Sequence, residues 1–143
     1  MSATPEAEEE VRQLFRRHVP EVNAGAVEIV CVARNVGRRS YVAVQSRAAA
    51  VDPVGACTGV RGVHAKAMVA DFKGEYLTIV RWDESPERFI RNAFGGRAPT
   101  EVVLDQAART AVVTIHQSLP RPSDIQLISE LTGWAISLRS REK

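Results

Sequence analysis

The sequence predicts an α/β protein of the α+β type, built from two small units in tandem. Apolar side chains repeat with a helical spacing in some segments and alternate, as they do in strands, in others. An offset of 59 residues places Gly74 on Gly133, and the apolar residues around the two glycines then coincide as well. The order hairpin, helix, strand therefore occurs twice. The 143 residues are enough for a real hydrophobic core.

The first predicted helix ends before Pro20. Thr4 can cap it, Pro5 suits its first position, and the glutamates that follow lie at the positive end of the helix dipole. A stripe at helical spacing is formed by Val11, Leu14, Phe15, His18 and Val19. We therefore expect an amphipathic helix that presents this stripe to a core.

Strands and short helices are predicted for the rest of the first half. Strands are expected at 27–34, 41–45 and 75–82, with a turn at 35–39. Helices are expected from Asp52-Pro53 through Cys57, over 62–72, and from Ser85-Pro86 to Gly95-Gly96. The first domain, with its N-terminal helix, is then residues 1–97 and the second is residues 98–143.

The second half repeats the plan in a shorter form. Strands at 101–104 and 110–116 flank a turn, and a last strand begins at Trp134. Ser123 to Gln126 reads as a capping box that opens a helix ending at Gly133. Residues 98–132 contain no glycine, so this half lacks the glycine loop of the first.

A G-x-x-G motif, Gly59-Val60-Arg61-Gly62, lies between two of the predicted helices. Paired glycines let a phosphate chain approach the backbone, and the following helix directs its N–H groups and positive dipole to the same place. Residues 34–70 carry a net charge of +5, from six basic residues and one acidic residue. These features favour a phosphate-binding site. The alternative is an ordinary helix–helix turn beside a solvated charged surface.

The run from Asp52 to Gly62 closely resembles the first KH domain of the bacterial NusA family. The resemblance continues at Val19-Pro20-Glu21-Val22 and Ile79-Val80-Arg81-Trp82, and Leu131-Thr132-Gly133-Trp134 is similar to the end of the second KH domain. It implies two tandem type II KH domains, each a small three-stranded sheet packed with helices on one face, the second truncated and degenerate. Near the place of its missing motif, the second has Leu119-Pro120-Arg121-Pro122.

The resemblance also implies where single-stranded RNA binds. The expected RNA-binding residues are Gly59, Val60, Arg61, Gly62, His64, Lys66, Arg38, Arg39, Arg47 and Val54. KH modules clamp about four nucleotides of backbone with such a loop. The family usually has arginine where this chain has His64, so we expect a weaker positive field at the loop.

The function expected is therefore that of a NusA-like RNA-binding protein in transcription elongation, termination or antitermination, with the transcription machinery as a further partner. The alternative is a KH-fold protein-interaction module that has lost RNA binding. We expect no enzyme activity, cofactor or metal, because His18, His64 and His116 stand outside any catalytic or metal-binding motif. The sequence shows no signal-peptide pattern and no long apolar run, so we expect a cytoplasmic protein without membrane contact. We also expect a monomer.

Overall fold

The computed structural model describes residues 4–95, 99–116 and 120–140. The chain divides into two compact units, Met1–Trp82 and Asp83–Lys143. This division falls before the helix Pro86–Phe94, whereas the expected boundary lay after it, at residue 97. The helix groups with the second unit because it contacts a strand and a helix of that unit.

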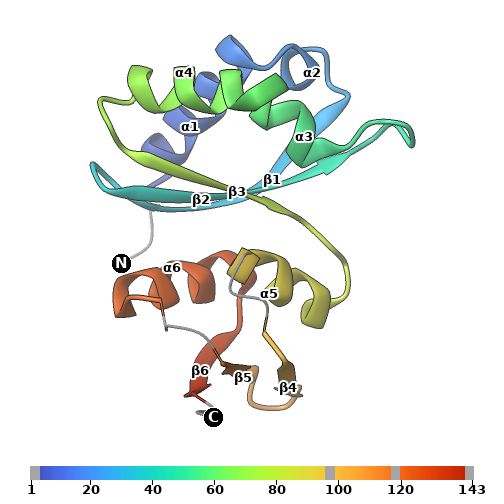
Figure 1. Cartoon of the computed structure of the whole chain (residues 1–143), viewed down its shortest axis with the longest axis vertical. Coiled ribbons are helices and arrows are strands. Elements are labelled where there is room, and N and C mark those ends of the chain that lie inside the picture. The colour runs from blue at the N-terminus through green and yellow to red at the C-terminus, as the bar shows by residue number, and fades with distance from the viewer. Residues whose placement is uncertain (1–3, 96–98, 117–119, 141–143) are drawn as a thin grey trace. The chain divides into compact units, whose positions relative to one another are not determined.

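The first unit is a three-stranded sheet with helices on one face (Figure 1). Its helices are α1 (Pro5–His18), α2 (Pro20–Asn23), α3 (Pro53–Thr58), the 3-10 turn η1 (Val60–Gly62) and α4 (Val63–Asp71). Its strands are β1 (Val27–Asn35), β2 (Arg39–Ser46) and β3 (Tyr76–Arg81). The central strand β2 pairs antiparallel with β1 and parallel with β3. A parallel pair needs a crossover connection, and here that connection carries α3, η1 and α4.

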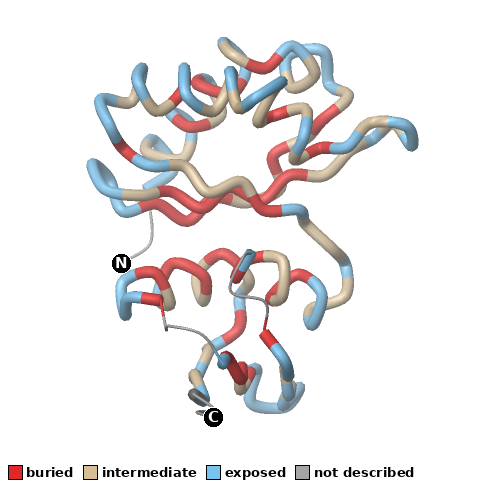
Figure 2. The backbone as a smooth tube through the Cα atoms, in the orientation of Figure 1, coloured by how far each residue is buried: buried red, intermediate tan, exposed pale blue. Residues whose placement is uncertain are grey.

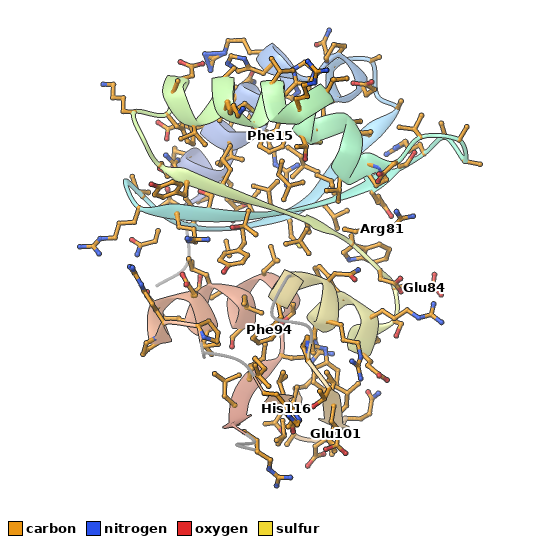
Figure 3. All side chains as sticks on the ribbon, viewed as in Figure 1. Phe15, Arg81, Glu84, Phe94, Glu101 and His116 are labelled. Atoms are coloured by element: carbon orange, nitrogen blue, oxygen red, sulfur yellow. The ribbon has the colours of Figure 1, made fainter. Side chains whose placement is uncertain are left out.

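The core of the first unit lies between the helices and the sheet, where Phe15 points (Figure 3). Helix α1 forms as the sequence predicts: Thr4 Oγ1 accepts a hydrogen bond from the Ala7 N–H at 3.1 Å, and the helix ends before Pro20. Strands β1 and β2 are buried along most of their length (Figure 2). The fully buried side chains of this core include Val11, Leu14, Phe15, Val42, Val44, Cys57 and Met68.

The second unit has the same sheet topology in a shorter chain. Its elements are α5 (Pro86–Phe94), β4 (Glu101–Asp105), β5 (Thr110–Ile115), α6 (Pro122–Thr132) and β6 (Ala135–Ser140). Strand β5 pairs antiparallel with β4 and parallel with β6, and α5 and α6 lie on one side of this sheet (Figure 1). The predicted α+β fold of two small sheets with helices is confirmed. A single described helix, α6, occupies the crossover that holds α3, η1 and α4 in the first unit.

The start of α6 was predicted wrongly. The helix begins at Pro122 with Arg121 as its cap residue, so Ser123 lies inside the first turn, and the Arg121 side chain makes no capping hydrogen bond. Proline at the first helical position sets the start because its backbone angle already suits a helix. At the start of α3, Asp52 holds the expected cap position but its side chain also makes no capping hydrogen bond. Leu119, part of the expected remnant of the second motif, lies outside the described residues.

Within the described ranges, no helix combines the length and apolar character needed to cross a membrane. The same residues contain no group of three or more His, Cys, Asp or Glu side chains arranged to hold a metal ion. Burial raises the pKa of the Cys57 thiol to about 12 and that of the Cys31 thiol to about 11. Both cysteines are therefore protonated and unreactive at neutral pH.

Candidate nucleic-acid interface

The loop Gly59–Gly62 joins α3 to α4 with an unusual backbone. Gly59 has φ of +81° and Gly62 has φ of +75°, and the intervening Arg61 also has a positive φ of 57°. Gly59 is required by space as well, because a Cβ there would lie 2.7 Å from His64 Cδ2 and 2.9 Å from the His64 backbone nitrogen. A Cβ at Gly62 would have open space, with Lys66 Cε nearest at 3.8 Å. The His64 ring therefore packs on the loop and fixes its path.

The side chains of the loop face solvent. Val60 is 80% exposed, Val63 at the start of α4 is 55% exposed, and Arg61 is also exposed. Gly62 is the cap residue of α4 and has no side chain that could bond the first N–H groups of the helix. An exposed guanidinium on a glycine-lined turn at a helix N-terminus suits a phosphate group.

An apolar groove of about 430 Å³ runs between α4 and the start of β3. It is lined by Ala65, Lys66, Val69, Ala70, Gly74 and Tyr76. Tyr76 is 61% exposed, and the Arg39 guanidinium lies 5.9 Å from the centre of its ring. An exposed aromatic ring, an apolar floor and two cations are what an unstacked base with its phosphate requires.

Tyr76 was not among the expected RNA-binding residues. The exposure of its side chain could have been inferred from the alternation along the strand. Leu77 and Ile79 pack on the core, and Tyr76 is out of phase with them. What the pattern could not show is that Arg39, which donates to Thr78 Oγ1 at 3.0 Å, lies over the Tyr76 ring. That contact depends on the parallel pairing of β2 with β3.

The other expected site residues lie in different places. Arg38 is exposed in the β1–β2 turn, where its carbonyl accepts a hydrogen bond from the Tyr76 N–H at 3.0 Å. Val54 is half-buried on α3 against the core. Arg47 lies outside the α4–β3 groove and pairs with Glu28 at 3.2 Å. Arg34, counted in the basic segment, is only 6% exposed. The segment is therefore not one continuous basic surface.

Arg34 forms a buried ion pair with Glu75. Its Nε and Nη2 donate to the two carboxylate oxygens at 2.8 and 3.0 Å, and Nη1 donates to the Ala7 carbonyl at 2.7 Å. The same carboxylate accepts from the Ser40 hydroxyl and from the Gly37 N–H. Burial opposes ionisation of Glu75, but the hydrogen bonds from Arg34, Ser40 and Gly37 outweigh it and lower its pKa. The pair thus holds the β1–β2 turn and the residue before Tyr76 in place.

The fold and the loop together define a class of domain: a three-stranded sheet with helices on one face and a G-x-x-G loop between two of them is a KH domain. Residues 6–82 match the family described as NusA-like first KH domain. The chain belongs to this NusA-like family, and its recognition from the Asp52–Gly62 run is confirmed.

Whole-length comparison with curated proteins agrees. The chain is 39% identical over 136 residues to the transcription termination/antitermination protein NusA of Mycobacterium bovis. It is 37% identical over 136 residues to that of Bacillus subtilis, and 35% identical over 139 residues to that of Halalkalibacterium halodurans. These alignments cover 90%, 91% and 93% of this chain but 39%, 37% and 36% of the relatives. The chain therefore spans somewhat more than a third of the length of these relatives.

Proposed function

We propose that this chain binds single-stranded RNA at the Gly59–Gly62 loop and the adjoining α4–β3 groove, without catalysing a reaction. It acts as a cytoplasmic monomer in transcription elongation, termination or antitermination, together with the transcription machinery. Membership of the NusA-like KH family and the names of the curated relatives support this role.

One observation carries the proposal: the exposed loop and the apolar groove are both bordered by the first turns of α4. Phosphates of an extended strand meet Arg61 and the backbone of the loop, and Lys66 links the loop to the groove. A base then lies against Val69 and Tyr76 in the groove. Affinity comes from the phosphates and from stacking, which are available to single strands of many sequences.

The sharpest test compares two glycines in different units. Gly62 (φ +75°, ψ 20°) and Gly133 (φ +79°, ψ 15°) share one left-handed conformation, and each lies near a basic side chain. Aspartate tolerates this conformation better than most residues. We expect Gly62→Asp to weaken binding of a fluorescent random-sequence RNA of about 12 nucleotides by on the order of tenfold or more, because the new carboxylate faces phosphate. Gly133→Asp is the matched control and should leave the affinity unchanged.

Gly62 is preferred to Gly59 for this purpose because a side chain at Gly59 would collide with His64. Circular dichroism and thermal unfolding should show both aspartate variants folded. Wild-type affinity in a folded Gly62→Asp variant would rule out the loop as the RNA site.

A second function is favoured by the exposed apolar side chains of the loop. Val60 and Val63 flank Arg61 and could contact a protein partner without RNA. If the chain has kept the KH fold but lost RNA binding, neither wild type nor either aspartate variant should bind RNA, at low salt or at high salt. That result would favour the interaction module.

A further inference from the structure

A second cavity of the first unit lies away from the α4–β3 groove. It has a volume of about 330 Å³ and is formed by α1, α2, the connection from α2 to β1, the start of β1 and the segment after β2. Three arginines, one glutamate and two buried apolar residues line it, namely Arg12, Arg16, Arg47, Glu28, Val27 and Ile29. None of them lines the α4–β3 groove.

The three guanidinium groups keep donors for a ligand. Arg12 is half-buried, and its Nη1 donates to the Ile29 carbonyl at 3.0 Å, which fixes the side chain in the cavity. Arg16 Nη1 lies 3.3 Å from a Glu9 carboxylate oxygen, and Arg47 Nη2 lies 3.2 Å from Glu28. Each contact uses one nitrogen of a group that carries five N–H donors. Arg16 and Arg47 are exposed, so both can reach an anion in solvent.

Glu28 adds an acceptor among these cations. It accepts a hydrogen bond from Gln45 at 3.0 Å and pairs with Arg47. The hydrogen bonds from Gln45 and Arg47 lower the pKa of Glu28, so it is ionised at neutral pH. An acidic peptide side chain would meet this carboxylate as a like charge. A nucleobase with an amino group would instead donate to it.

We propose that this cavity binds one nucleotide of single-stranded RNA as a second site on the first domain. The phosphate contacts Arg16 and Arg47 at the mouth, and the base stacks on the Arg12 guanidinium beside the start of β1, with its amino group donating to Glu28. This combination of an acceptor, a cation to stack on and an anion site matches a nucleoside monophosphate unit. The inference goes beyond RNA binding at the loop and does not require it.

The experiment is an amide-shift titration of the full, isotope-labelled chain with cytidine and uridine 5′-monophosphates. Cytidine monophosphate, which carries an amino group, should shift the amides of Gly25, Val27 and Glu28 and bind more tightly than uridine monophosphate. The Arg16→Gln, Arg47→Gln double variant should weaken this binding on the order of tenfold. Arg17→Gln is the matched control, because Arg17 pairs with Asp71 at 3.4 Å and does not line the cavity. It should bind as wild type does.

Three outcomes would overturn the proposal. Equal shifts with inorganic phosphate at the same concentration would reduce the cavity to a general anion site. Tighter binding of an aspartate- and glutamate-rich peptide at the same amides would assign it to a protein partner. Absence of shifts at these amides would mean that the nucleotide does not bind in this cavity. The Gly62→Asp variant should give the wild-type titration here, so failure of the loop as an RNA site leaves this test intact.

Discussion

The two units share one sheet topology but differ at the same buried position. Equivalent points of the pairing registers place Arg34, Ser40 and Glu75 of the first unit on Leu104, Ala111 and Trp134 of the second. The first unit therefore buries an ion pair with a hydroxyl group where the second has three apolar residues. Glu75 is 2% exposed and Trp134 is 3% exposed, and Ser40 and Ala111 are both fully buried, whereas Arg34 is buried and Leu104 is only half-buried.

The second unit thus forms the same sheet topology without an ion pair at this position. A buried ion pair is often no better for stability than apolar residues of similar volume, because removing two charges from water costs about as much as their attraction returns. In the first unit, however, the carboxylate also binds Ser40 and the Gly37 N–H, next to Tyr76 and Arg38. The ion pair and its hydroxyl partner therefore occur in the unit that carries the glycine loop, and the three apolar residues occur in the unit that lacks this loop.

The largest effect is expected from breaking the pair on one side. Glu75→Ala removes the bidentate partner of the buried Arg34 guanidinium, which keeps Glu10 at 2.6 Å, and should lower the free energy of unfolding by at most about 3–5 kcal/mol. Urea denaturation followed by tryptophan fluorescence measures this loss. The matched control is the triple variant Arg34→Leu, Ser40→Ala, Glu75→Trp, which gives the first unit the three apolar residues of the second. Its free energy of unfolding should stay within about 2 kcal/mol of that of wild type. A control as unstable as Glu75→Ala would mean that the two positions are not equivalent.

Acid should remove the contribution of the pair gradually. The folded pKa of Glu75 lies below its ordinary value of 4.5, so its contribution to stability is complete above about pH 4.5. This contribution is lost as the pH falls through the lower folded pKa. On acidification the free energy of unfolding of wild type should therefore fall relative to that of the triple control. Urea titrations of both proteins between about pH 6 and pH 3 measure this difference, and a constant value would contradict the assignment.

The smallest effect concerns salt. The proposed phosphate contacts of Arg61, Lys66 and one of the arginines of the β1–β2 turn predict a log–log slope of RNA affinity against salt of roughly −2 to −3 for a single strand. Lys66→Gln should make this slope shallower by about 0.7. Arg121→Gln, at the start of the helix in the second unit, should not change it. Equal slope changes in the two variants would mean that both units contact phosphate.

The sequence alone was sufficient for most of the elements and for the loop, because their signals are local, but it missed α2 and misplaced the start of α6. Thr4 and Pro5 mark the start of α1 within a few residues, and the glycines at 59 and 62 are required by their own backbone angles. The helical stripe likewise identified Phe15 as a core residue.

Contacts between distant segments could not be predicted in this way. Arg34 looked like one member of a basic surface because nothing near it in sequence indicates its burial, and its partner is Glu75 on the far side of the crossover. Arg47 likewise lies in the cavity with Arg12 because β2 returns beside β1. The helix at 86–94 follows the first sheet in sequence yet contacts the elements after it.

The distance in sequence between Arg34 and Glu75 has a kinetic consequence. The two residues are 41 positions apart, and α3, the loop and α4 all lie between them. The β1–β2 hairpin can form early because its contacts are local, but its guanidinium stays without the carboxylate until β3 has paired with β2. We therefore expect this pair to close late in the folding of the first unit, when β3 joins the sheet and completes the crossover that carries the glycine loop.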